Sequence, residues 1–220
     1  MQRCPISKEE ETMPEQVDLT VEEQTRPRID WKPGARALGV SESFRKEDQR
    51  SVVAGVVMRA DLKVDGAGFC LPRVGGMDAT DEILSMFFRL GRSDIRAWLI
   101  GGAVISWFNI IDLHRLHEET DIPVVSVSYE ESEGIKRYLE EYFPKDWERR
   151  YAVLMRNGER SRIALDNGFE VFVNTIGIPT QDGRSLLNAF THQGKAPEPI
   201  RVAGVIAASL RRDLGKKTGL

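Results

Sequence analysis

The pattern of hydrophobic and polar positions changes its period along the chain. In the first third, runs rich in Val and Gly are separated by polar turns, which predicts three consecutive β-strands at residues 36–40, 51–59 and 64–71. Over residues 83–90 the apolar positions instead recur at helical spacing, and Gly91 follows as a candidate C-terminal residue. The pattern therefore predicts an antiparallel meander followed by a helix.

Strands and helices alternate through the middle of the chain. The predicted order is strand, helix, strand and helix, at residues 96–100, 105–119, 123–128 and 131–142. This alternation is typical of parallel strands joined by crossover helices. Together with the meander, it predicts an α/β fold with one mixed sheet and flanking helices.

The last part of the chain predicts hairpin strands and then two helices. The strands are expected at residues 151–155, 161–165 and 169–174, separated by Asn-Gly and Asp-Asn-Gly turns. The helices are expected at residues 182–191 and 199–212, the second starting with proline. We therefore expect a small antiparallel hairpin addition, residues 151–177, within the same domain.

Composition adds a leader to this picture. Residues 1–34 are rich in Glu and Pro and carry eight acids against five bases, whereas the remaining chain is electrically balanced. We expect a flexible acidic leader there, followed by a single domain over residues 35–220. No apolar run approaches the roughly 20 residues of a membrane span, and no secretory signal is visible, which favours a cytoplasmic protein.

Overall charge does not decide whether the chain binds nucleic acid. The net charge is −3, but phosphate binding depends on a local cluster of bases rather than on the total. Candidate clusters are residues 45–46, 149–150 and 211–217, although each also fits an ordinary solvated face. The two cysteines form neither a disulfide framework nor a zinc cluster.

Two polar residues follow the predicted strand 96–100 among apolar neighbours. Asn109 and Asp112 are three apart in the predicted helix 105–119, so they share a face with Ile105 and Phe108. Burying them costs free energy unless they are hydrogen-bonded or hold a ligand. Two interpretations stay open: a satisfied polar pair in a packed helix, or a site at the carboxyl end of a strand, where open α/β sheets bind ligands.

Three segments resemble the signature blocks of the archaeal endonuclease dU family. They read Asp-Ala-Thr-Asp at residues 78–81, Phe-Asn-Ile-Ile-Asp-Leu at 108–113 and Pro-Glu-Pro-Ile-Arg-Val-Ala at 197–203. The resemblance implies a ribonuclease-H-like sheet, distantly similar to endonuclease V. It also implies a Mg²⁺- or Mn²⁺-dependent endonuclease that cleaves DNA beside deoxyuridine, a DNA-repair activity with DNA as the partner.

The resemblance also implies roles for a few polar residues. Two-metal cleavage needs acidic oxygens that converge on ions about 4 Å apart. We expect Glu42 and Asp78 to be the metal ligands and Asp112 to be a supporting acid of the catalytic set. Asp78 could equally be the capping residue of a helix, and Asp112 could equally bind a backbone group or an Arg side chain. The residues expected to contact the substrate are Thr80, Asn109 and Arg201.

The chain departs from the family pattern at three positions. Where relatives usually read Gly-Ile-Asp-Asp-Gly on the first strand, residues 39–43 read Gly-Val-Ser-Glu-Ser. Gly101 stands where many relatives have Asp, and Gly204 where they often have His. Because successive strand residues point to opposite faces, Glu42 need not reach the place of the missing Asp. These departures favour a second hypothesis, a catalytically impaired paralogue that acts as a nucleic-acid- or protein-binding module.

Overall fold

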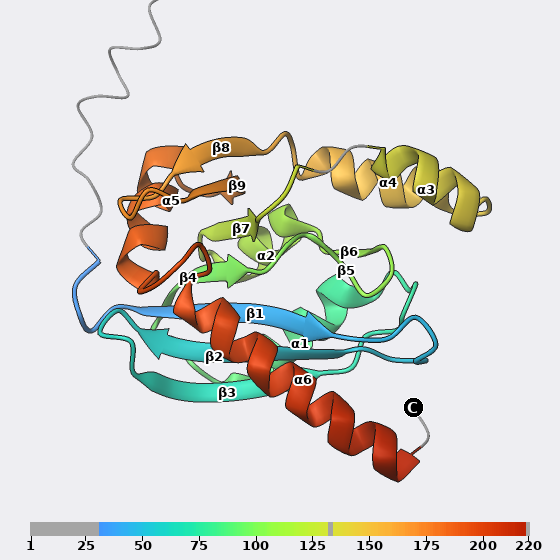
Figure 1. Ribbon diagram of the computed structural model, residues 1–220, viewed down its shortest axis with the longest axis horizontal. Helices are drawn as coiled ribbons and strands as arrows, with labels where there is room; N and C mark the ends of the chain where they lie inside the picture. Colours follow the sequence, from blue (N-terminus) through green and yellow to red (C-terminus); the bar gives the residue numbers. More distant parts are fainter. Residues whose placement is uncertain (1–30, 132–133, 219–220) are drawn as a thin grey trace, which may run out of the picture.

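The structure, a computed structural model, describes residues 31–131 and 134–218, and a seven-stranded sheet forms its centre (Figure 1). Its strands are β1 (Arg36–Ser43), β2 (Val52–Arg59), β3 (Val64–Cys70), β4 (Ile95–Ile100), β7 (Val124–Ser128), β8 (Ser161–Ala164) and β9 (Glu170–Ile176). They lie in the order β3-β2-β1-β4-β7-β9-β8. The pairs β3–β2–β1 and β7–β9–β8 are antiparallel, whereas β4 runs parallel to both β1 and β7.

Helices cover both faces of this sheet. They are α1 (Ala79–Leu90), α2 (Leu113–Thr120), α3 (Ile135–Tyr142), α4 (Trp147–Arg156), α5 (Thr180–Phe190) and α6 (Glu198–Thr218). The helices α5 and α6 pack on one face, and α1 and α2 on the other, while α3 and α4 lie beyond the strand ends (Figure 1). Within the described part of the chain, no helix is long and apolar enough to cross a membrane.

The two-residue period of the strands divides the core between these faces. Ala37 and Leu99 belong to the cluster under α5 and α6, whereas Leu38 and Ile100 belong to the cluster under α1 and α2. All four are essentially inaccessible to water. Burying a side chain of the size of Leu or Ile contributes about 1.5–3 kcal/mol, so both layers hold the central strands in place.

Most elements predicted from the pattern are confirmed. The meander, α1 with its left-handed C-terminal Gly91, the strands β4 and β7, and the two final helices are present at the expected places. The mixed α/β sheet is confirmed as well, and its antiparallel addition, β8 and β9, extends the main sheet because β9 pairs with β7. Most of the predicted leader, residues 1–30, lies outside the described residues.

The predicted helix 105–119 is wrong over its first half and confirmed over its second. Its first half is a small hairpin of β5 (Val104–Ile105) and β6 (Asn109–Ile110), and α2 begins only afterwards. The three turn residues, Ser106 to Phe108, have φ values of 46°, 59° and 61°, which a right-handed helix cannot contain. Asp112 caps α2 by accepting a hydrogen bond from the Arg115 N–H, so Asn109 and Asp112 share no helix face.

The predicted strand 151–155 is also wrong, because these residues belong to α4. They read Tyr-Ala-Val-Leu-Met, and a short continuous apolar run fits a buried strand as well as a segment of a helix. However, Trp147 and Tyr151 are one helical turn apart and their rings are in contact, with centroids 6.4 Å apart. The helix predicted from residue 131 begins later, at Ile135.

The start of α6 lies directly on β1. A methyl carbon added at Gly39 would be only 2.3 Å from the Pro199 carbonyl carbon and from its Cβ. We therefore expect Gly39→Ala to force the helix off the sheet and to lower the free energy of unfolding by about 1–3 kcal/mol in urea titrations. In the same helix, a carbon added at Gly215 has no neighbour within 4 Å. Gly215→Ala is the matched control, and an equal loss in both variants would contradict this explanation.

Candidate nucleic-acid interface

The β5–β6 hairpin engages the acid at the end of β1. The Ser106 N–H and hydroxyl both donate to Glu42 Oε2, at 2.7 and 2.5 Å, and the Ser51 hydroxyl lies 2.5 Å from that of Ser106. Burial raises the pKa of Glu42 above its usual value of 4.5, because the loss of hydration outweighs the opposing hydrogen bonds from Ser106. Glu42 is thus a desolvated carboxylate whose Oε2 already accepts two hydrogen bonds.

The same hairpin engages Asp78 through Asn109. The Asn109 amide is fully buried and donates to Asp78 Oδ1 at 2.8 Å and to the Arg73 carbonyl at 3.0 Å. Its Oδ1 accepts from the Ala79 N–H, the first residue of α1, at 3.0 Å. Asp78 also accepts from the Arg73 N–H. The structure therefore brings Asn109 and Asp78 together as the joint between the hairpin and α1.

The other predicted site residues fall into two further places. Thr80 Oγ1 accepts from the Asp112 N–H at 2.9 Å, and the Asp112 carboxylate pairs with Arg156 at 2.7 Å. These contacts connect α1, α2 and α4. Arg201 is an exposed side chain at the start of α6 and pairs with Glu198 at 2.6 Å. Arg201 is thus part of a local ion pair at a helix N-terminus.

A buried arginine from the candidate cluster at residues 149–150 holds the hairpin turn in place. Arg150 in α4 is only 4% exposed, although its position in the 149–150 cluster suggested a solvated base. Its guanidinium donates to the carbonyls of Gly75, Gly76 and Phe108 at 2.7–2.9 Å and pairs with Asp146 at 2.9 Å. Arg150 thus joins α4, the loop before α1 and the hairpin turn.

The predicted magnesium ligands do not fit a two-metal centre as they stand. Such a centre needs several carboxylates that converge on the ions. Here Glu42 accepts from Ser106, Asp78 from Asn109 and Arg73, and Asp112 from Arg115 and Arg156. Over the residues that the structure describes, no group of three or more His, Cys, Asp or Glu is placed to hold a metal ion.

The three departures from the family pattern meet at one point in space. Ser41 faces α6, opposite to Glu42, as the alternation along β1 predicts. A carbon added at Gly204 would lie 3.2 Å from Ser41 Oγ, and one added at Gly101 would lie 3.7 Å from the same atom. The acidic and imidazole groups that the family pattern leads one to expect are therefore lacking at a single place, where β1, β4 and α6 meet.

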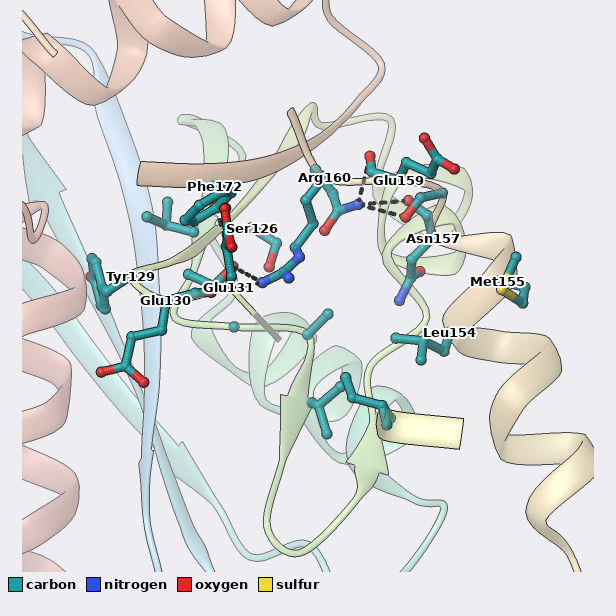
Figure 2. A pocket seen from close by; sticks show the side chains of 18 of the residues that line it. Ser126, Tyr129, Glu130, Glu131, Leu154, Met155, Asn157, Glu159, Arg160 and Phe172 are labelled. Atoms are coloured by element: carbon teal, nitrogen blue, oxygen red, sulfur yellow. Dashed lines mark hydrogen bonds between the residues drawn. The ribbon is translucent and has the colours of Figure 1, made fainter. Parts of the chain in front are cut away.

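A pocket opens beside this place, at the carboxyl ends of β4 and β7. It has a volume of about 890 Å³, within the usual range for small-ligand sites. Gly101 and Gly102 form part of its wall, and Ile135 and Met155 line it from α3 and α4. Figure 2 shows the Arg160 side chain extending into the pocket near Phe172, whose ring centre lies 5.4 Å from the guanidinium carbon.

Polar groups on the pocket wall are firmly placed. The Asn174 amide donates to the carbonyls of residues 157–159, and Asn157 bridges the Leu113 N–H and the Ile111 carbonyl. Arg160 donates to the Ser128 hydroxyl at 2.9 Å and to the Glu130 carbonyl at 3.1 Å. The sequence pattern suggested a ligand site at the carboxyl end of the strand 96–100, which forms one side of this pocket, but not the residues of α3, α4 and β9 that complete it. The serines that alternate at residues 126 and 128, where an apolar strand ends, were a further visible signal.

The overall arrangement of sheet and helices is shared with solved nucleases. The endonuclease V of Ciona intestinalis, solved with a 24-nucleotide DNA that contains inosine, superposes with a TM-score of 0.55 at 11% identity, over 82% of this chain and 87% of that chain. A crystal structure of a protein of unknown function from Archaeoglobus fulgidus gives a TM-score of 0.71 at 28% identity, over 80% and 97%. The fold is thus ribonuclease-H-like and similar to that of endonuclease V, as expected.

Sequence similarity defines the family. The model of the endonuclease dU family matches residues 33–211, and a UPF0215 protein of Pyrobaculum calidifontis is 32% identical over 182 residues, which cover 82% of this chain and all of that protein. The chain belongs to the endonuclease dU family.

The buried carboxyl group of Glu42 predicts a pH effect on stability. The pKa of Glu42 is higher in the folded protein than in the unfolded chain, so at pH values between 4.5 and the folded pKa folding is accompanied by uptake of a proton. The contribution of Glu42 to stability therefore falls as the pH rises through this range. Glu42→Gln cannot ionise. We expect the free energy of unfolding of this variant, relative to the wild type, to increase as the pH rises above 4.5 in urea titrations. A difference that is independent of pH, or equal to that of the exposed Glu47→Gln control, would argue against a desolvated Glu42.

The Arg150 contacts predict a large structural effect. Arg150→Met leaves three carbonyl groups without their donor, and we expect it to cost about 3–5 kcal/mol of unfolding free energy. The neighbouring Arg149 is exposed, so Arg149→Met should change stability by no more than about 0.5 kcal/mol. If thermal and urea unfolding showed comparable losses of stability for Arg150→Met and Arg149→Met, the structural role assigned to Arg150 would be contradicted.

Proposed function

We propose that this chain is a nucleic-acid-binding member of the endonuclease dU family that lacks two-metal cleavage. The pocket at the ends of β4 and β7 binds an unpaired nucleotide, and the protein does not hydrolyse the phosphodiester bond beside it. A cytoplasmic location remains part of this proposal.

The observation that carries the proposal is the meeting of Ser41, Gly101 and Gly204 at one place, from which Gly101 also contributes to the pocket wall. The acidic and imidazole side chains that the family pattern leads one to expect are lacking at this place, while a pocket of about 890 Å³ is present beside it. The nearest acid on the same strand, Glu42, points to the opposite face and is held by Ser106. Loss of the reacting groups with retention of the pocket supports binding without cleavage.

Nucleic acid is the ligand class that the comparisons favour. The family is one of endonucleases, and the Ciona endonuclease V of the same fold is solved with DNA. In this chain, Arg160 lines the pocket, and its guanidinium can interact with phosphate. A pocket of about 890 Å³ is large enough for a nucleobase with its sugar.

A second candidate is the activity of the family, Mg²⁺- or Mn²⁺-dependent cleavage of DNA beside deoxyuridine. It is favoured by one observation: Glu42 and Asp78 are both bound to the same short hairpin, through Ser106 and Asn109. A shift of that hairpin frees both carboxylates for metal ions. Thr80, Asn109 and Arg201 keep their expected substrate roles, and Asp112 its supporting role, in this candidate.

The two candidates differ in a nicking assay. A labelled duplex with one deoxyuridine is incubated with the protein, with and without Mg²⁺ or Mn²⁺, in parallel with Asp78→Ala. We expect no metal-dependent nicking from either protein, but binding of a labelled oligonucleotide by the wild type. Because Arg160 is a pocket base, Arg160→Gln should weaken this binding and lower its logarithmic salt slope by about one, whereas Arg162→Gln, on an exposed part of β8, should not.

Metal-dependent nicking that disappears in Asp78→Ala would establish the second candidate instead. Absence of both nicking and binding, in protein shown to be folded by circular dichroism, would contradict both candidates and leave a protein-binding module.

A further inference from the structure

Four aromatic side chains gather on the surface next to the hairpin. Trp107 and Phe108 belong to the hairpin turn, and Tyr138 and Tyr142 to α3; we call these four residues the aromatic surface. The two tyrosines are the exposed members, at 46% and 43%. Their rings are parallel within 2°, with centroids 6.3 Å apart, and those of Trp107 and Phe108 lie 5.1 and 6.5 Å from the Tyr142 ring.

The backbone places two of these rings at an energetic cost. Left-handed backbone costs an ordinary residue about 1–2 kcal/mol, and Trp107 and Phe108 both adopt it, together with Ser106. Strain of this kind persists where surrounding contacts impose it, and it is concentrated at functional sites. Here the contacts come from Arg150, which donates to the Phe108 carbonyl, and from Phe143, whose ring packs on that guanidinium at 3.9 Å. These contacts hold the hairpin turn in its left-handed conformation.

A cation completes the aromatic surface. The Lys46 ammonium, from the loop between β1 and β2, lies 3.9 Å from the centre of the Trp107 ring and 5.3 Å from that of Tyr142. A positive charge beside flat rings is the arrangement by which proteins bind single-stranded nucleic acid, with bases on the rings and phosphates near the charge.

The exposed groups do not suit an ordinary protein partner as well. In the described residues, the most exposed aliphatic side chains, Val64, Met155 and Val205, lie on β3, α4 and α6 rather than on this surface. The exposed rings here are tyrosines with polar tips, which combine a flat apolar face with a hydroxyl that remains hydrated. Flat bases match this surface better than branched side chains do.

We propose that the aromatic surface binds single-stranded nucleic acid by stacking unpaired bases on Tyr138 and Tyr142, with Lys46 beside the phosphates. The proposal rests on the proposed function and extends it, because the helix that carries the tyrosines also contributes Ile135 and Lys136 to the pocket. A strand that places one nucleotide in the pocket then continues over the aromatic surface.

The test is fluorescence anisotropy with the full chain and a fluorescein-labelled oligothymidylate. We expect the Tyr138→Ala/Tyr142→Ala double variant to bind at least about tenfold more weakly than the wild type, since each stacked base contributes about that factor or more. The matched control, Phe88→Ala/Phe169→Ala, removes two exposed rings at 57% and 47% on other elements and should bind as the wild type does.

Two further probes separate stacking from charge and from folding defects. An abasic oligonucleotide of the same length carries the phosphates without the bases. We expect the wild type to bind it as weakly as the tyrosine double variant binds oligothymidylate. Binding of oligothymidylate should also quench tryptophan fluorescence, and Trp107→Phe should remove most of that quenching while circular dichroism stays unchanged.

Several results would overturn the proposal. One is equal affinity of the wild type for the abasic oligonucleotide and for oligothymidylate. Another is a loss of affinity in the phenylalanine control as large as that in the tyrosine variant. A third is that the tyrosine variant loses a protein dimer and keeps its affinity for the oligonucleotide. Binding that depends on Arg160 but not on the tyrosines would leave the proposed function in place and refute the aromatic surface alone. No binding by the wild type would refute both.

Discussion

The buried Arg150 guanidinium is the interaction on which the rest of the site depends. It satisfies three backbone carbonyls from two loops that are more than 30 residues apart in sequence, and a single acid, Asp146, balances its charge. A planar cation with several fixed donors suits this task, because it replaces the hydrogen bonds that the loops would otherwise make with water. The Gly75 N–H, which donates to the Ser106 carbonyl at 2.7 Å, joins the left-handed turn to the loop before α1 directly, and the Arg150 guanidinium adds its three hydrogen bonds to this contact.

The fold follows from patterns that act over short distances. Alternation in the meander identifies β1 to β3, and the helical spacing before Gly91 identifies α1, because in both cases one face of a regular element is buried. The segment after β4 does not follow such a pattern. Its conformation comes from contacts of Ser106 with Glu42 and of Phe108 with Arg150, whose partners are about 40 to 64 residues away. No local period records such contacts, so the segment was assigned to a helix.

The site shows the same division. Two residues of the family blocks, Asn109 and Thr80, are buried and hydrogen-bonded. Their partners are backbone N–H groups at the starts of α1 and α2, so in the structure these side chains join helices and hairpin to one another. The pocket itself comes from strand ends, α3, α4 and β9, which only the three-dimensional arrangement brings together. Asn157 illustrates the difficulty: its Asn-Gly sequence suggests a turn residue, whereas its side chain fastens the segment around Ile111 in the core.

The close packing of α6 on β1 couples positions that are far apart in the chain. With the Pro199 backbone packed against Gly39, the helix lies so close to β1 that Gly204 is directly opposite Ser41. Any side chain larger than hydrogen at residue 204 takes space from residue 41, and the reverse is equally true. Substitutions at these two positions are therefore epistatic. The combined volume of the two side chains limits the order in which they can be substituted or reversed, whatever their chemistry.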